Sequence, residues 1–479
     1  MRSFFFTHIL PYRIANEPLE FLMNTDFGID PGQLHAQLKN SHGSLLGLHR
    51  FYFSELLPSF PNRLNLPYPV QSESYVMDCL PHALFMQIGY RLLGIPCTID
   101  FTPFWSRADN GHHWNSVINY HTPEERINEN NTAQSAKVYR NSFTPNPIPA
   151  FNGYDFIPPL FRDPFVRDVT EKYCRVADIT IGLGKNKAHA SQDIYLCVFN
   201  KREWQPIACS RSRKKSVTFK NVGIGNIYLP IIYEGIHKIP VSYPFEVLEN
   251  GELRILEPSP EVQSLTLTRK YPVSSFKMKW DRNMSGVQLW GYQMQGGPGI
   301  FLAEIDDLNE APFFDLDFMA GQWKYLKISA NPDYPYKPIN IAEISFWNSE
   351  NQEIDFKQLI LLDKQTTRSE EVREKISDKN VLSYFDFYDH LIFTFEENRT
   401  IQKIKLISRN DDNYITPGDD YELLYFSPEG WVSLEFKKAT ERKLEFDQVP
   451  VNALFWLRNI SKGREERIFT YESGSVVFW

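Results

Sequence analysis

Residues 77–117, MDCLPHALFMQIGYRLLGIPCTIDFTPFWSRADNGHHWNSV, hold the pattern that decides the fold of the first part of the chain. Asp78 is typical of a helix N-cap, and the apolar residues that follow it recur at helical spacing. Gly94, with a proline two residues later, predicts the end of this helix. We therefore expect Cys79 at the start of a helix, where free backbone N–H groups and the helix dipole stabilise a thiolate.

Two strands are expected after this helix, at 95–101 and 112–120, and the second carries His112 and His113. A cysteine at a helix start that faces a histidine on a strand is the arrangement needed for nucleophilic acyl chemistry. The histidine keeps the sulfur ionised and later protonates the leaving group. Neighbouring residues of a strand point to opposite faces, so only one of the two histidines can meet Cys79.

The same residues resemble a known family. The order Asp-Cys, an apolar helix, Arg-Leu-Leu-Gly-Ile-Pro at 91–96 and His-His-Trp-Asn at 112–115 is similar to the pattern of the bacterial transglutaminase-like superfamily. The resemblance implies a papain-like α+β domain with a Cys-His-Asp triad. It assigns the nucleophile to Cys79 and the base to His112, because Trp114 must lie two positions after that histidine. Trp114 would shield the pair from water and border the substrate.

The third member of the triad has two candidates. The family pattern places an aspartate on the next strand, but the segment His-Thr-Pro-Glu-Glu-Arg-Ile-Asn-Glu-Asn-Asn at 121–131 offers Asn128 and Glu129 nearest to that place. Either side chain can orient a histidine, since asparagine and glutamate both do so in related constellations. The departure from the pattern leaves two interpretations, an active enzyme and a degenerate scaffold.

The composition bounds the function classes. The chain has 479 residues, with 51 basic and 59 acidic side chains, so its net charge of −8 excludes a general nucleic-acid binder. No apolar run of about eighteen residues predicts a membrane span. The five cysteines, an odd number, leave at least one thiol free and form no disulfide framework. The first residues lack an export signal, so the protein is either intracellular or extracytoplasmic with a signal that lies outside this chain, and we expect the second.

Four domains are expected, which gives a multi-domain α+β protein. The first, 1–155, is the transglutaminase-like domain. Short strands separated by turn residues predict an all-β, immunoglobulin-like sandwich over 160–258. Two further aromatic-rich sandwiches follow, at 262–355 and 380–479, or form one interleaved assembly. Their segments resemble discoidin-like and galactose-binding-like sandwiches.

Metal binding is an alternative role for the cysteine and histidine side chains of this stretch. A zinc site could combine Cys79 and His82 with His112 or His113 and His121, but the spacing is irregular and we expect no metal there. A second candidate is an acidic loop that could hold Ca²⁺ or form a solvated turn. It contains Asp411, Asp412, Asn413, Asp419 and Asp420. No other cofactor is expected.

The sequence favours a thiol-dependent acyl-transfer enzyme, a hydrolase or transamidase, acting on a peptide, glycopeptide or glycoprotein. In that hypothesis Cys79 attacks an amide carbonyl and His112 protonates the leaving amine, while the sandwiches bind carbohydrate. The alternative is a degenerate transglutaminase-like scaffold that binds cell-surface glycan. A third hypothesis is a structural scaffold within a larger assembly. These inferences draw on the appended domains by analogy.

Overall fold

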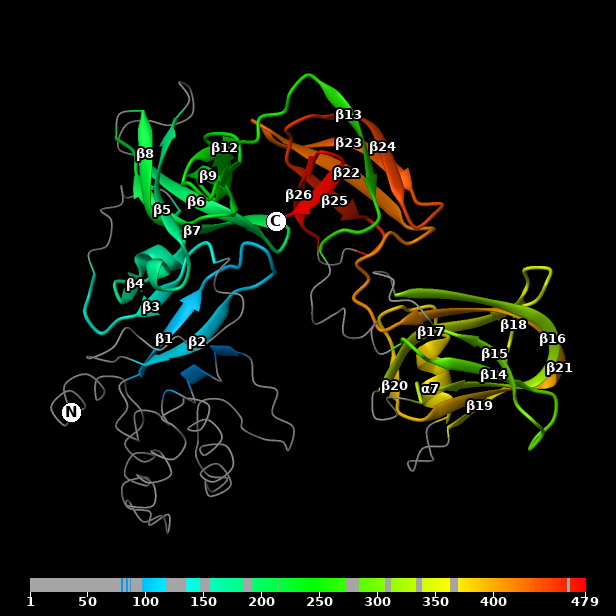
Figure 1. Ribbon diagram of the computed structural model, residues 1–479. Helices are drawn as coiled ribbons and strands as arrows, with labels where there is room; N and C mark the ends of the chain where they lie inside the picture. Colours follow the sequence, from blue (N-terminus) through cyan, green and yellow to red (C-terminus); the bar gives the residue numbers. More distant parts are fainter. Residues whose placement is uncertain are drawn as a thin grey trace, which may run out of the picture.

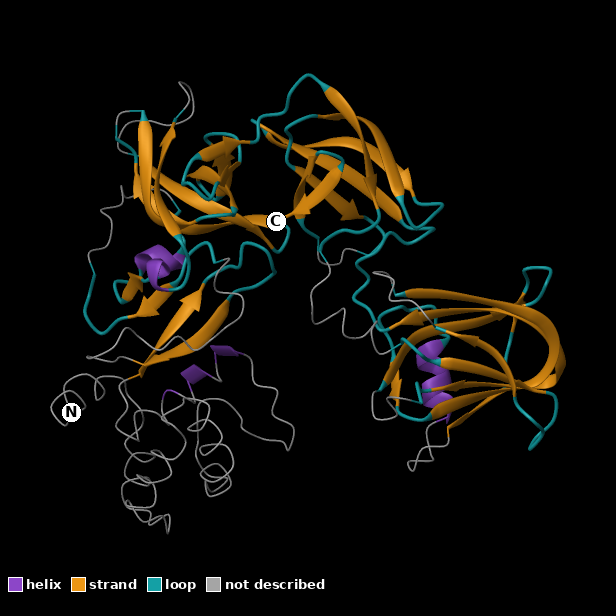
Figure 2. Ribbon diagram, in the orientation of Figure 1, coloured by secondary structure: helices purple, strands orange, loops and turns teal. Residues whose placement is uncertain are grey.

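The structure is a computed structural model. It describes residues 79–80, 83–84, 87, 97–117, 135–146, 156–183, 192–213, 215–272, 284–305, 312–332, 338–361, 369–462 and 466–479. Figures 1 and 2 show that the regular secondary structure of this part of the chain is nearly all β-sheet. Strands account for 56% of the described residues and helices for 5%.

The expectation of an α+β protein with a papain-like first domain is therefore wrong. The only α-helix of the described residues with defined bounds is α7 (Ser369–Ile376), which lies far along the chain from residues 77–117, and two short 3-10 helices lie at Pro159–Arg162 and Thr170–Lys172. Helical conformation in that first stretch is described at Cys79, Leu80, Ala83, Leu84 and Gln87 only. Over residues 97–102, apolar and polar residues alternate with period two, which favours a strand rather than a helix. The coarser expectation of a multi-sheet, sandwich-rich protein is confirmed.

The first sheet has the order β2-β1-β3-β4. Its strands are β1 (Cys97–Thr102), β2 (His112–Val117), β3 (Tyr139–Asn141) and β4 (Val166–Asp168). All pairs are antiparallel. Since β4 pairs with β3, this sheet extends past position 155, where the sequence predicts the first boundary.

The second unit combines a six-stranded sheet with a two-stranded one. The larger sheet has the order β12-β11-β9-β6-β7, with β10 paired to β9, and β5 pairs with β8. Its strands are β5 (Val176–Gly182), β6 (Asp193–Asn200), β7 (Glu203–Arg211), β8 (Ser216–Gly223), β9 (Ile227–Glu234), β10 (His237–Pro240), β11 (Phe245–Val247) and β12 (Leu253–Ile255). β6 and β9 are buried on both faces, which explains why their sequences are continuous apolar runs.

The third unit covers residues 284–408 and forms an eight-stranded sheet that bends back on itself. The long strands β16 (Phe313–Ser329) and β21 (His390–Ser408) pair along their whole length, with irregular register at 317–321 and 323–325. One end of this pair is flanked by β14 (Gln288–Tyr292), β15 (Ile300–Glu304) and β19 (Gln358–Leu361). The other end is flanked by β17 (Ile339–Trp347), β18 (Glu353–Ile354) and β20 (Phe385–Phe387). The bent pair thus joins two layers, and α7 packs between them (Figure 1).

The last unit is discontinuous in sequence. β13 (Val262–Leu267) pairs with β24 (Leu444–Pro450), and both pack on a sheet of order β23-β22-β25-β26-β27. The strands of that sheet are β22 (Asp420–Ser427), β23 (Gly430–Lys438), β25 (Phe455–Asn459), β26 (Ile468–Glu472) and β27 (Ser475–Phe478). The unit of 284–408 is therefore inserted into this sandwich, and its sheet crosses the expected gap between 355 and 380.

The second and last units share one hydrophobic interface. Trp204 and Phe199 pack against Phe426, Trp431 and Trp456 as edge-to-face and stacked rings, so the outer face of β6 and β7 is covered by the C-terminal sandwich. The view in Figure 1 places the C-terminus at this junction. Within the described ranges, none of the helices has the length and apolar character that a membrane crossing requires.

One carboxyl in the inserted unit predicts a pH effect on stability. Glu343 of β17 is half-buried beside Asp378, and burial, followed by the hydrogen bond to Asp378 and its charge, raises the pKa of Glu343 to about 8. An acid whose pKa is raised in the folded state stabilises the fold fully below its unfolded pKa of about 4.5 and loses that contribution as the pH rises toward 8. After discounting for partial exposure, we expect Glu343→Gln to be more stable than the wild type by about 1–2 kcal/mol at pH 9.

Urea unfolding at pH 5 and pH 9 checks this expectation. The advantage of the variant should shrink at pH 5, where the wild-type carboxyl is largely protonated. Glu353→Gln, at an exposed position of the same sheet, is the matched control and should show no such trend. Equal pH dependence in the wild type and Glu343→Gln would contradict the prediction.

Candidate active site

The register of β1 and β2 separates the two histidines. Phe101 pairs with His113 and Thr102 pairs with His112, so the histidines point to opposite faces of the sheet. Gly111 precedes them at a close approach of two chain segments, where a Cβ atom would lie 2.3 Å from the Pro103 carbonyl oxygen. This tight passage fixes where β2 begins and therefore which histidine faces which side.

The structure brings Cys79 together with His113. The Sγ atom of Cys79 lies 3.8 Å from Nδ1 of His113, within hydrogen-bonding range for sulfur. Cys79 is half-buried, and the ring of Phe101 stacks on the imidazole with its centroid 5.3 Å away. A half-buried thiol with an imidazole at this distance has the two groups that nucleophilic acyl transfer requires.

Two hydrogen bonds fix the helical segment against the strands. Asn115 Nδ2 donates to the carbonyl oxygen of Ala83 at 2.8 Å, and Gln87 Nε2 donates to that of Cys97 at 3.4 Å. Asn115 lies two residues after His113, on the same face of β2. Its amide therefore holds the helix that carries Cys79 at the face that carries His113.

His112, which the family pattern assigns as the base, lies on the other face. Its ring stacks between Trp105 and Trp114, with centroid separations of 6.2 and 5.8 Å. Trp114 shares that face, as expected for positions two apart, but it is buried against Tyr173. The structure thus places both His112 and Trp114 away from the Cys79 thiol, and the expected shielding of the pair by Trp114 does not occur.

The face of β1 opposite Cys79 carries a buried ion pair that sequence reasoning missed. Asp100 is 0% exposed, and Arg140 of β3 binds both of its carboxylate oxygens at 2.7 Å. Tyr173 donates its hydroxyl to the same carboxylate, and burial together with Asp100 raises the pKa of Tyr173. An aspartate inside the apolar run Cys-Thr-Ile-Asp-Phe-Thr could have signalled it, because a buried carboxylate requires a partner.

The loop between β1 and β2 is held by the two neighbouring units. The Asn200 side chain donates to the carbonyl oxygens of Trp105, Ala108 and Asn110 at 2.8–3.0 Å. Arg467, 1% exposed, lies with Nη2 3.1 Å from Oδ1 of Asp109. The loop that leads into the two histidines is therefore anchored by the second unit and by the C-terminal sandwich.

Both candidates for the third triad member, Asn128 and Glu129, lie outside the described residues. The same holds for His82 and His121, which the zinc hypothesis would need. Among the residues that the structure describes, no group of three or more His, Cys, Asp or Glu side chains is placed to hold a metal ion.

The acidic loop that sequence reasoning considered for Ca²⁺ contains a lysine ammonium group. Lys462 Nζ lies 3.3 Å from Oδ1 of Asp412 and 3.1 Å from Oδ2 of Asp419. The Asn413 side chain is also occupied, since its oxygen accepts from the backbone N–H groups of Lys270 and Tyr271. A fixed cation of the chain itself thus neutralises two acids of this loop.

The five cysteines differ in their environments, which predicts the order in which they react. All five are free. Burial raises the pKa of the Cys209 thiol to about 12 and raises that of Cys197 still further, so neither forms the reactive thiolate near neutral pH. We expect iodoacetamide at pH 7.5 to modify Cys79 in the folded protein while Cys197 and Cys209 stay unmodified. Peptide mass mapping reads this out, and modification of Cys197 before Cys79 would contradict it.

Comparisons with protein-family models, with curated proteins and with solved structures give no match to this chain.

Proposed function

We propose that this chain is a thiol-dependent acyl-transfer protein in which Cys79 is the nucleophile and His113 the base. The observation that carries the proposal is the separation of 3.8 Å between Cys79 Sγ and His113 Nδ1 on the helix-facing side of β2. The resemblance of the motif at 77–117 to the transglutaminase-like superfamily supports the same chemistry. The proposal replaces His112 by His113 and makes no use of a papain-like fold.

The reaction follows from the two groups. His113 accepts the thiol proton, and the thiolate of Cys79 attacks the carbonyl carbon of an amide. The C–N bond breaks as the imidazolium returns the proton to the leaving amine, which leaves a thioester on Cys79. Water or an acceptor amine then attacks the thioester, and His113 takes up the proton of that nucleophile. The C–S bond breaks, which releases the carboxylic acid or the new amide, and the imidazolium returns the proton to the Cys79 sulfur. We propose a peptide, glycopeptide or glycoprotein as the acyl donor.

The thioester is the species that tests the proposal. The full chain is mixed with p-nitrophenyl acetate, and the acetylated residue is identified by mass spectrometry after rapid acid quenching. We expect an acetyl group on Cys79 that hydroxylamine removes, and we expect its loss in Cys79→Ala. Half-buried Cys174, which donates to the Ser135 carbonyl oxygen, is the internal control. Acetylation of Cys174 at the same rate as Cys79 would overturn the proposal.

A further inference from the structure

The inserted unit of 284–408 presents a mixed aromatic and polar sheet face that the proposed acyl chemistry does not use. The core-facing residues of β14 and β16 are Leu289, Leu326 and Ile328, all buried. The alternate residues of the same strands therefore point outward. This outward set consists of Gln288, Trp290 and Tyr292 on β14 and of Tyr325, Lys327 and Ser329 on β16, all half-buried.

The strand register arranges these side chains in neighbouring pairs. Trp290 pairs directly with Lys327 on one side and with Phe301 of β15 on the other, and Tyr292 pairs with Tyr325. Directly opposite side chains in an antiparallel pair have Cβ atoms about 4.5–5.5 Å apart. Phe301 is 50% exposed and packs edge to face against Trp290 at 5.4 Å. An ammonium group thus lies beside a cluster of four aromatic rings.

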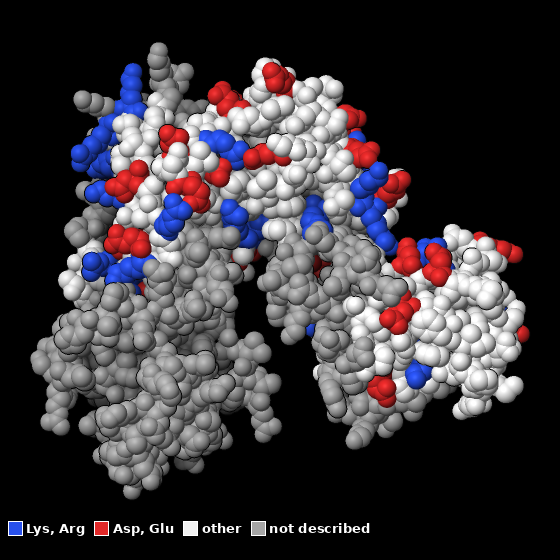
Figure 3. Space-filling view, viewed as in Figure 1, with Lys and Arg blue, Asp and Glu red and all other residues white. Residues whose placement is uncertain are grey.

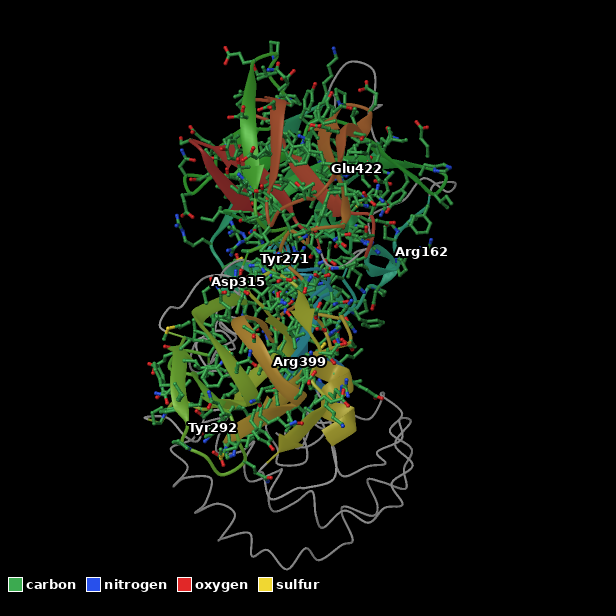
Figure 4. The ribbon with its side chains drawn as sticks, turned by 90° about the vertical axis from the view of Figure 1, so that its right-hand side faces the viewer. Arg162, Tyr271, Tyr292, Asp315, Arg399 and Glu422 are labelled. Carbon is green, nitrogen blue, oxygen red and sulfur yellow. The ribbon has the colours of Figure 1, made fainter. Side chains whose placement is uncertain are left out.

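Lys327 has no carboxylate partner within the part of the chain that the structure describes. Its direct neighbours across the strands are Trp290 and Ile392, neither of which carries charge. Glu304 of β15 pairs with Gln288 in the next row of side chains, and its carboxylate accepts from Gln288 Nε2 at 2.8 Å. Figure 3 shows acidic and basic side chains scattered over the visible face of this unit, with uncharged surface between them, and Figure 4 shows Tyr292 at the periphery of the unit.

We propose that this outward face, which we name the β14–β16 face, binds a glycan that contains uronic acid. A pyranose ring has an apolar C–H face that stacks on an aromatic ring, as Trp290 and the two tyrosines could provide. A uronic acid carries its carboxylate directly on that ring, so a sugar stacked on Trp290 brings its charge to the neighbouring Lys327. In the next row, Gln288 Oε1 accepts from Trp290 Nε1 at 3.3 Å and so helps to orient the indole, while the Ser329 side chain can bond a sugar hydroxyl group.

The charge of Lys327 favours a glycan with carboxylate groups over a neutral glycan. Lys327 is a cation beside apolar rings, where a carboxylate gains a charge-assisted hydrogen bond that a hydroxyl does not match. The interaction lies at a partly exposed surface, so salt must weaken it. The site is more than a hydrophobic patch, because polar side chains lie beside the aromatic ones on both strands.

Binding of the full chain to polygalacturonate, measured by calorimetry, tests the proposal, with fully methyl-esterified polygalacturonate as the uncharged matched ligand. We expect binding of the charged polymer that is at least about tenfold tighter than that of the ester, and a similar loss in Lys327→Gln. Trp290→Ala should also weaken binding at least about tenfold. Lys403→Gln, which removes a lysine of β21 that already pairs with Asp317, should leave binding unchanged.

The outcome is separable from that of the acyl chemistry, because Cys79→Ala should bind polygalacturonate as the wild type does. Circular dichroism of each variant confirms that the sheets are retained. No binding of polygalacturonate by the wild type would overturn the proposal. Equal binding of the acid and the ester, or binding that survives Trp290→Ala and Lys327→Gln, would overturn it as well.

Discussion

Replacing Arg140 by methionine is expected to destabilise the first sheet by about 3–5 kcal/mol. The reason is that Asp100 is fully buried and its carboxylate charge is compensated by the two hydrogen bonds from Arg140. Methionine fills a similar volume but leaves the charge with the Tyr173 hydroxyl as its one hydrogen-bond donor among the residues that the structure describes. An uncompensated buried carboxylate costs far more than a lost surface contact.

Arg175→Met is the matched control for this prediction. Arg175 also forms an ion pair with a carboxylate, that of Glu249, but the two side chains are 70% and 73% exposed. Exposed pairs contribute roughly 0–1 kcal/mol, so this variant should unfold close to the wild type. Urea unfolding gives the two free energies, and hydrogen exchange of β1 and β2 locates the loss. If the two variants lost equal stability, the buried pair would not have the role given to it here.

The second large effect concerns the proposed reaction. His113→Ala is expected to lower the rate of acetyl transfer through Cys79 by a factor of about 10²–10⁴, the usual contribution of a general base. His112→Ala removes the same chemical group one residue away, on the opposite face of β2. The rate of acetyl transfer in that variant should fall by less than about threefold, because the His112 ring stacks between Trp105 and Trp114 and lies away from the thiol.

The measured quantity is the rate constant of p-nitrophenol release at a saturating concentration of p-nitrophenyl acetate. Thermal unfolding of each variant checks that it is folded. Retained folding with lost transfer in His113→Ala assigns the effect to the imidazole. If His112→Ala lowered the transfer rate more than His113→Ala did, the base would be His112, as the sequence motif implies.

The sequence pattern predicts that a histidine of the 112–113 pair meets Cys79, but it selects His112, whereas the structure places His113 beside the thiol. The H-x-W spacing predicted His112, and alternation predicted that one histidine of the pair would face away. Which one faces Cys79 depends on the register of β2 against β1, and a slip of one residue exchanges the two faces. That register depends on the passage at Gly111 and on anchors such as Asn200 and Arg467, which are remote in sequence.

The strands of the C-terminal half were recognisable, whereas their partners were not. Period-two alternation indicates which face of a strand is buried, but it does not specify the strand beside it. β13 and β24 are separated by the entire inserted unit, so no local signal joins them. Likewise, the bend of β16 and β21 arises from register irregularities at 317–325, and the expected gap near 355–380 turned out to lie inside one sheet.

The ion pair of Asp100 and Arg140 is partly predictable from the sequence. A lone aspartate within an apolar strand predicts a buried partner of opposite charge. The identity of that partner was not predictable, since Arg140 comes from β3, which lies forty residues further along the chain. The third side chain on this carboxylate, Tyr173, lies beyond the expected domain boundary.

Alkylation of Cys79 by iodoacetamide is the most direct test of the thiol–imidazole pair, because it requires no substrate. Its rate is compared in the wild type, His113→Ala and His112→Ala. We expect the His113 variant to react at least about tenfold more slowly at pH 6.5, because it lacks the imidazole beside the thiol, and we expect the His112 variant to match the wild type. Equal rates in the wild type and His113→Ala, or a loss confined to His112→Ala, would contradict it.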